Sequence, residues 1–108
     1  MKNEININCP VVNAVNVIGG KYKIIILYHL SEGTLRFNEL QKRIPYATPK
    51  MLTQQLRELE RDKLISRTVY PVVPPKTEYA LTDYGKSIMP VLEALCDWGK
   101  TYLETPEC

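Results

Sequence analysis

Several polar side chains in the middle of the chain fall on one side of a predicted helix. The segment 48–63 is predicted to be helical because Thr48 can cap a helix with its hydroxyl and Pro49 suits the first helical position. Leucines and the stem of Lys63 recur at helical spacing and form one apolar face. At about 100° per residue, a sector roughly 100° wide on the opposite side contains no acidic residue. Its members are Lys50, Thr53, Gln54, Arg57 and Arg61.

The chemistry of this sector suits the major groove of DNA. Arginine and lysine pair with guanine, glutamine pairs with adenine, and threonine contacts a thymine methyl group or a phosphate. The acidic residues of the same helix, Glu58, Glu60 and Asp62, are predicted to fall outside the sector. The alternative is an ordinary surface helix with a solvated charged face, which is a common arrangement.

The distribution of charge supports a polyanionic partner. The chain has 108 residues and a net charge of only +2, which by itself says little about partners. Between Arg36 and Lys76, however, nine basic residues stand against four acidic ones, whereas the remaining positions carry five basic and eight acidic residues. A basic middle with acidic flanks indicates that one face meets a polyanion.

The elements around the long helix predict a winged helix-turn-helix. A shorter helix over 38–44, with Asn38 near its cap, is followed by a turn at 45–47 and then by the long helix, which is the helix-turn-helix arrangement. A strand over 64–70, a proline-rich loop over 71–75 and a returning strand over 77–81 form the wing. A short extended piece, 35–37, precedes the first of the two helices. The predicted fold is mainly α with a small antiparallel β-hairpin, an α+β winged helix-turn-helix.

Three further basic residues are candidates for contacts with the DNA backbone. Lys76 is expected at the tip of the wing and Arg67 on its stem, where they reach phosphates or a minor groove. Arg36 precedes the shorter helix, and a solvated arginine is the alternative there. The wing could also be a hairpin that only covers the edge of the core. The complete set of DNA-contact candidates is Arg36, Thr48, Lys50, Thr53, Gln54, Arg57, Arg61, Arg67 and Lys76.

The two ends of the chain are predicted to be apolar helices that exceed the needs of one small domain. The first runs from Pro10 to a stop at Gly19–Gly20. The segment 21–30 is predicted to be a largely buried second helix, with a strand as the alternative because of its run of three isoleucines. The last is capped by Thr82, runs to about Leu103, and is kinked or split by Pro90. Exposed apolar stripes of this kind predict a symmetric homodimer. The candidate interface residues are Val11, Val15, Ile18, Val91, Leu95, Trp98 and Tyr102.

Cys9 is a candidate sensor because it stands at a helix start, which favours the reactive thiolate. The alternative is a small residue that packs in the dimer interface. Cys96 lies on the apolar stripe of the last helix and is expected to be core. Cys108, the last residue, could resolve an oxidised Cys9 of the other subunit.

The composition predicts one domain over residues 1–108, with a loose leader at 1–8, a folded part at 9–103 and a tail at 104–108. No signal peptide or membrane span is expected, and three cysteines without pairable spacing indicate a reducing compartment, so a cytoplasmic location is predicted. Scattered cysteines and one histidine form no metal-ligand cluster. No catalytic pair, phosphate loop or cofactor motif is present, so neither an enzyme nor a cofactor is predicted.

Taken in order, short motifs cover nearly the whole chain and resemble the HxlR-type family of bacterial winged-helix (MarR-like) transcription regulators. They are CPV (9–11), IGGK (18–21), RFNEL (36–40), PKMLTQ (49–54), LRELE (56–60), VPPK (73–76), EY (78–79), LT (81–82) and WG (98–99). The resemblance implies a homodimer on an inverted-repeat operator, dimerisation through the first and last helices, and, in a subset of members, a thiol switch at the N-terminal cysteine.

Two positions depart from the family pattern. Lys63 stands where the family usually has glycine, and Tyr22 where tryptophan is usual. Both bear on stability. The function predicted is a sequence-specific DNA-binding regulator, with two alternatives: a winged helix used as a protein-interaction module, or a regulator that answers an unidentified small molecule without a thiol switch.

Overall fold

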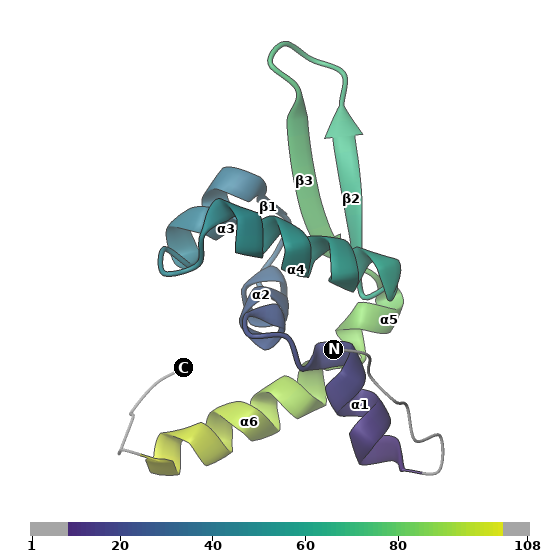
Figure 1. The fold of residues 1–108 in the computed structure, drawn as a ribbon, viewed down its shortest axis with the longest axis vertical. Helices are drawn as coiled ribbons and strands as arrows, with labels where there is room; N and C mark the ends of the chain where they lie inside the picture. Colours follow the sequence, from purple (N-terminus) through teal and green to yellow (C-terminus); the bar gives the residue numbers. More distant parts are fainter. Residues whose placement is uncertain (1–8, 103–108) are drawn as a thin grey trace.

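The computed structural model describes residues 9–102, so the predicted leader at 1–8 and the tail after Tyr102 lie outside the described residues. Helices and strands follow one another in the order expected of a winged helix-turn-helix (Figure 1). The helices are α1 (Pro10–Ile18), α2 (Lys23–Leu30), α3 (Phe37–Arg43), α4 (Pro49–Arg61), α5 (Asp83–Lys86) and α6 (Met89–Thr101); the strands are β1 (Leu35–Arg36), β2 (Ile65–Tyr70) and β3 (Lys76–Leu81).

The predicted wing is confirmed, and it belongs to a sheet with one more strand. Strands β2 and β3 pair antiparallel from Ile65↔Leu81 to Tyr70↔Lys76. The short strand β1 pairs with the other edge of β3, with Leu35 opposite Tyr79, so the strand order is β1-β3-β2. The sheet therefore ties the segment before α3 to the wing.

The core lies between α2, α3, α4 and the base of the sheet. Apolar side chains of these elements are buried together, and several have almost no contact with solvent. At roughly 25 cal/mol per Å² of apolar area removed from water, such residues supply most of the favourable free energy of folding. The most deeply buried are Ile26, Leu27, Leu40, Ile44, Leu52, Leu56, Leu59 and Ile65.

The last predicted helix is split, as Pro90 indicated. Helix α5 ends at Lys86 and α6 begins at Met89, with Pro90 in the first turn, where its missing N–H removes no helical hydrogen bond. Thr82 caps α5 by accepting a hydrogen bond from the Gly85 N–H at 2.9 Å. The hydroxyl of Thr82 also donates to the carbonyl of Lys63 at 2.6 Å, which ties α5 to the base of the wing.

Some helix boundaries differ from the prediction. Helix α2 begins at Lys23 and not at Lys21. Helix α3 begins at Phe37 and not at Asn38, and the N–H of its N-cap residue, Arg36, donates to Glu39 Oε1 at 2.8 Å. Helix α4 ends at Arg61, and Lys63 follows it with φ 66° in the left-handed region. Lys63 therefore takes no part in the apolar face of the helix.

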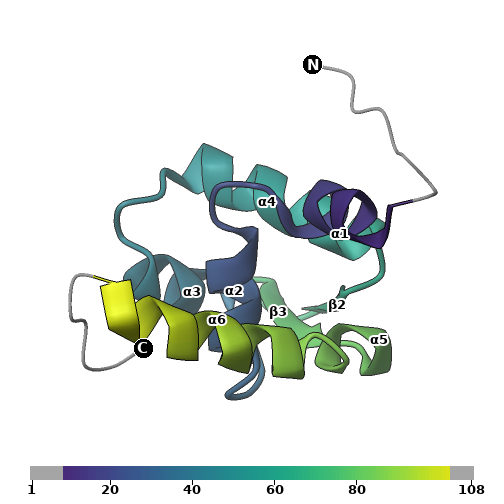
Figure 2. The same cartoon turned by 90° about the horizontal axis from the view of Figure 1, so that it is seen from below.

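The wing and the terminal helices lie at opposite ends of the molecule. Figure 1 shows β2 and β3 projecting from one end, with α1 and α6 at the other, and in Figure 2, which is seen from below, α6 crosses in front of α2. No residue of α1 is buried, and α6 buries only Leu92. Within residues 9–102 no single helix is long and apolar enough to cross a bilayer; α1 and α2 meet that standard only when counted together, across a bend of 78°.

Candidate nucleic-acid interface

Helix α4 places its polar sector on the surface. Thr48 caps the helix, since its Oγ1 accepts the Met51 N–H at 3.1 Å and its own hydroxyl proton stays available for a phosphate. Leucines on the other side of α4 are buried, which fixes the rotation of the helix. The polar sector is exposed except for Thr53, which is half-buried. Its exposed members are Lys50, Gln54, Arg57 and Arg61.

Acidic side chains on α4, and on Asp62 directly after it, lie closer to the polar and basic side chains than helical periodicity predicted. Gln54 Nε2 lies 3.4 Å from Glu58 Oε2, and Arg61 Nε lies 3.3 Å from Asp62 Oδ1. Glu60 Oε1 lies 3.3 Å from Arg67 Nε on the wing. In the part of the chain that the structure describes, Lys50 and Arg57 take part in no ion pair. These two cations can therefore bind a phosphate or a guanine without breaking an ion pair to a described residue.

The wing differs from its prediction at the tip. Lys76 is the first residue of β3, opposite Tyr70, and its Nζ lies 5.1 Å from the centroid of the Tyr70 ring. The tip itself is uncharged and carries Val73, which is 99% exposed. Lys76 and Arg36 line the same groove between α3 and the wing, and Arg36 Nε lies 3.7 Å from Glu78 Oε2. The cations thus surround the wing stem and leave its tip neutral.

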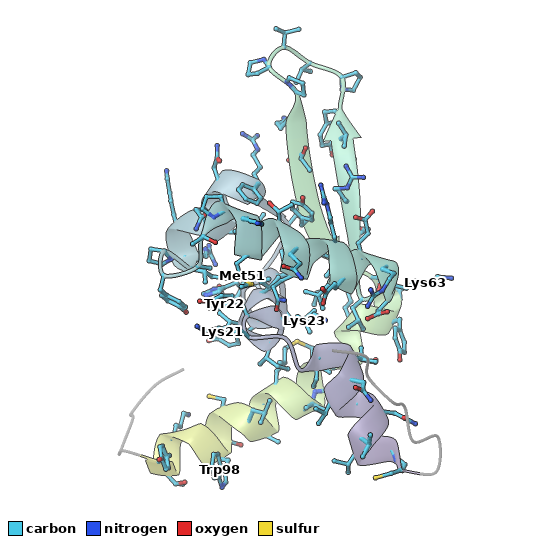
Figure 3. The ribbon with its side chains drawn as sticks, in the orientation of Figure 1. Lys21, Tyr22, Lys23, Met51, Lys63 and Trp98 are labelled. Atoms are coloured by element: carbon cyan, nitrogen blue, oxygen red, sulfur yellow. The ribbon has the colours of Figure 1, made fainter. Side chains whose placement is uncertain are left out.

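A buried connection between α2 and α4 was not predicted. Lys23 Nζ lies 2.7 Å from Glu58 Oε1, and the Lys23 side chain is only 5% exposed. Beside it, the buried Gln55 accepts the Tyr22 N–H through Oε1 at 3.2 Å. Figure 3 shows Tyr22 and Lys23 beneath α4. The one sequence signal was Gln55, a polar residue at a position that the spacing of the leucines assigns to the core.

This connection also explains Gly20. A Cβ atom built on Gly20 would lie 2.3 Å from Gln55 Oε1, so a side chain there would displace the buried amide. Hydrogen bonding by Lys23, the largest cause, lowers the pKa of Glu58 from its ordinary value, while partial burial acts in the opposite direction. The carboxylate is therefore ionised and available as an acceptor for Gln54.

The candidate dimerisation residues lie on α1 and α6, and most are exposed in the single chain. Val11 is 70% exposed and Trp98 66%, and the ring of Trp98 stacks on Tyr102 with centroids 6.0 Å apart. Figure 3 shows Trp98 on the part of α6 that lies farther from the wing. Ile18 differs, because it is half-buried and packs against the core. The exposed members are Val11, Val15, Val91, Leu95, Trp98 and Tyr102.

Cys9 is the residue before the first turn of α1; its thiol is free and half-buried. Cys96 is disulfide-bonded, which contradicts the expectation of unpaired cysteines, and Cys108 lies outside the described residues. Among residues 9–102 no group of three histidine, cysteine or acidic side chains could hold a metal ion.

The chain is similar to known helix-turn-helix proteins, in agreement with the fold described above. A model of the HxlR-like helix-turn-helix family matches residues 17–107. A relative from Methanothermobacter thermautotrophicus, named as an HTH-type transcriptional regulator, is 57% identical over 94 residues, which cover 87% of this chain and 72% of the relative.

Two solved structures are similar in both sequence and shape. The HTH-type regulator YtcD superposes with a TM-score of 0.85 at 49% identity, covering 89% of this chain and 98% of YtcD. The oxidised form of the redox regulator HypR superposes with a TM-score of 0.82 at 47% identity, covering 86% of this chain and 96% of HypR. Both therefore match the full winged helix-turn-helix described above.

Proposed function

The chain belongs to the HxlR-like helix-turn-helix family of transcription regulators, and we propose that it binds an inverted-repeat operator in double-stranded DNA as a homodimer. The observation that carries this proposal is the outer face of α4, where Lys50, Gln54 and Arg57 are exposed over a buried leucine face. A helix of this size fits the major groove, and these side chains are the types that read base edges there.

The wing supplies the second contact. Lys76 and Arg67 on its stem, with Arg36 beside it, reach the phosphates that flank the groove in which α4 lies. Cations in this position add affinity that depends on salt and not on base sequence. A DNA operator as partner implies that the protein works in the cytoplasm.

The homodimer is supported by the apolar surface at the other end of the molecule. Val11 and Val15 on α1 and Val91, Leu95 and Trp98 on α6 are exposed, and a monomer would leave them in water. A two-fold axis beside these helices gives two copies of α4, which match the two halves of an inverted repeat.

A protein-interaction module is the alternative class of function. Such a module would need an apolar or acidic outer face on α4, because charged residues are depleted from the cores of protein interfaces. Lys50 and Arg57, which form no ion pair with any residue that the structure describes, argue for DNA instead. Among residues 9–102, no particular contact favours a small-molecule effector.

Gel-shift titration on the protein's own upstream region tests this assignment. We expect Gln54→Ala and Arg57→Ala each to weaken specific binding by about 1–3 kcal/mol. Lys100→Ala, at the end of α6 remote from the wing, is the matched control and should bind normally. Unchanged footprints for both α4 variants would refute the assignment of this face.

A thiol response at Cys9 is a second candidate, and it is supported by the similarity to the redox regulator HypR and by the free, half-buried thiol. The family match begins at residue 17, so membership alone does not carry this role to Cys9. With a thiol switch, diamide changes operator affinity in the wild type, and Cys9→Ser binds DNA normally but ignores diamide. If the wild type keeps its affinity after diamide, Cys9 is a packing residue.

A further inference from the structure

We infer that Glu58 is a positioning residue for base recognition. Its ionised carboxylate is paired with the Lys23 ammonium and orients the Gln54 amide, so that the Gln54 side chain selects adenine over guanine. The inference rests on the proposed function, in which Gln54 reads a base. The preference for adenine over guanine then depends on the contact between Gln54 and Glu58, beneath the DNA-facing surface, and not on Gln54 alone.

The geometry joins three side chains in a row. The Lys23 ammonium lies 2.7 Å from Glu58 Oε1, and the other oxygen of the same carboxylate, Oε2, lies 3.4 Å from Gln54 Nε2. Lys23 is buried, Glu58 is half-buried and Gln54 is exposed on the outer face of α4. The row thus runs from the core to the surface that the proposal assigns to DNA.

The carboxylate decides which way the Gln54 amide faces. A glutamine amide has two N–H donors and one oxygen acceptor, whereas an ionised carboxylate only accepts. The amide must therefore turn its nitrogen toward Glu58, because the opposite orientation places its oxygen against the negative charge. One N–H is then engaged, and one N–H and the oxygen remain for a base.

The remaining pair of groups matches adenine and not guanine. Adenine offers an N7 acceptor and an N6 donor in the major groove, so the free N–H and the oxygen of Gln54 can bind both. Guanine offers two acceptors, N7 and O6, and would need two free donors. Without Glu58 both N–H groups of Gln54 would be available, and the preference for adenine would weaken.

Lys23 makes an acidic residue tolerable on this helix. An unpaired carboxylate next to the DNA-facing sector would repel phosphates and lower affinity for every sequence. The Lys23 ammonium balances that charge from below, and it is held in place because the neighbouring Tyr22 N–H is bound to the buried Gln55 at 3.2 Å. The Glu58 carboxylate can therefore accept a hydrogen bond from Gln54, while the pair of Lys23 and Glu58 carries no net charge.

The experiment uses the double variant Lys23→Met/Glu58→Leu. It removes the acceptor and both charges together, so the net charge and the non-specific attraction to DNA stay the same. Apolar replacements of a largely buried ion pair are often neutral for stability, and a thermal melt checks that the variant folds. Arg43→Met/Glu32→Leu is the matched control, because it removes a different ion pair, 2.8 Å long, on other elements.

Binding sites are first selected by the wild-type protein from a randomised double-stranded DNA library. The base pair read by Gln54 is the one whose preference disappears in Gln54→Ala. At that position we expect Lys23→Met/Glu58→Leu to reduce the adenine-to-guanine ratio of affinities about 5- to 10-fold, part of the roughly 5- to 150-fold that a good bidentate pair provides. The control pair should leave the ratio unchanged, and in a Gln54→Ala background the double variant should have no further effect.

Two results would overturn the inference, and they differ in what else they affect. If Gln54→Ala loses the preference but the double variant keeps it, Glu58 does not position Gln54, and the proposed DNA-binding function is unaffected. If Gln54→Ala keeps the preference of the wild type, Gln54 reads no base, and its assignment in the proposed function fails together with the inference.

Discussion

The ammonium of Lys23 and the carboxylate of Glu58 are 2.7 Å apart and join α2 to the recognition helix α4, with Lys23 only 5% and Glu58 28% exposed. Breaking such a pair from one side leaves a buried charge without a partner. We expect Glu58→Ala to lower the free energy of unfolding by about 3 kcal/mol, near the lower limit for buried pairs because Glu58 is partly solvated. Urea denaturation measures this, and Lys23→Met/Glu58→Leu should recover most of the loss. A Glu58→Ala protein as stable as the wild type would contradict the prediction.

The ion pair between Lys23 and Glu58 also predicts that the free energy of unfolding depends on pH in the acidic range. Hydrogen bonding by Lys23 lowers the pKa of Glu58 in the folded protein below its ordinary value of 4.5. The contribution of Glu58 to stability is therefore fully present above pH 4.5 and is lost as the pH falls through the lower, folded pKa. In urea titrations at decreasing pH, Lys23→Met/Glu58→Leu should lose less stability in this acidic range than the wild type does. Parallel curves for the two proteins would show that the pair is not linked to protonation.

Exposed apolar residues on α6 predict that the protein is a dimer at micromolar concentration. Analytical sedimentation measures this. Trp98 is 66% exposed in the single chain and stacks on Tyr102. Trp98→Ala should therefore change the folding of an isolated chain little, but weaken the dimer by about 3–5 kcal/mol if the partner buries the ring completely. Tyr84→Ala, at an exposed aromatic residue of α5, is the comparison. A wild-type protein that sediments as a monomer would refute the assembly.

The position of Lys76 predicts how the wing contributes to DNA binding. Lys76 lies on the stem, over the ring of Tyr70, and has no base edge assigned to it. Lys76→Ala should weaken specific and non-specific binding alike, and reduce the slope of log affinity against log salt by about one. Filter binding at several salt concentrations measures the slope, and Lys100→Ala serves as the control. An unchanged slope would mean that Lys76 meets no phosphate.

The recognition helix and the wing could be predicted because their signals are local in the sequence. Thr48 and Pro49 mark the start of α4, and the prolines of 71–75 mark the turn of the wing. Pro90 likewise predicted the break between α5 and α6. Each of these residues acts through its own backbone or its nearest neighbours, so no knowledge of the tertiary structure was needed.

Contacts between elements could not be predicted in the same way. Lys23 lies in an apolar run, and its partner Glu58 is on another helix, so the sequence gives no sign that the lysine is buried. The contacts between Glu60 and Arg67 and between Asp62 and Arg61 depend on side-chain rotamers, which helical periodicity does not define. The extended piece at 35–37 was predicted, but its pairing with β3 was not, because strand β1 has two residues, too few for an alternating pattern.

Lys63 closes α4 in a conformation that glycine adopts more easily. Its N–H donates to the Glu60 carbonyl and the Leu64 N–H donates to the Leu59 carbonyl, both at 3.0 Å, with φ 66° at Lys63. This is the Schellman motif, in which the residue after the helix takes the left-handed conformation. The motif ends α4 abruptly, so that Leu64 and Ile65 can enter the first strand of the wing.

We predict that Lys63→Gly raises the free energy of unfolding by about 0.5–1 kcal/mol. The Cβ of lysine crowds the following carbonyl and costs roughly 1–2 kcal/mol. Two terms offset part of this gain: lysine near a helix C-terminus gains a few tenths of a kcal/mol from the helix dipole, and glycine makes the unfolded chain more flexible. Lys63→Ala is the control, because it loses the charge but keeps the Cβ, and it should not stabilise the protein.

The effect on DNA binding should be small, because Lys63 follows the end of α4 and is not part of the helix that carries Lys50 and Arg57. Figure 3 shows its side chain pointing away from the end of α4. Urea denaturation and gel-shift titration of the same preparations separate the two properties. Lys63→Gly should be more stable than the wild type and bind the operator with an affinity within about twofold, since one charge outside the interface is largely screened at physiological salt. A glycine variant less stable than the wild type would mean that the contacts of the lysine side chain outweigh the strain at its backbone.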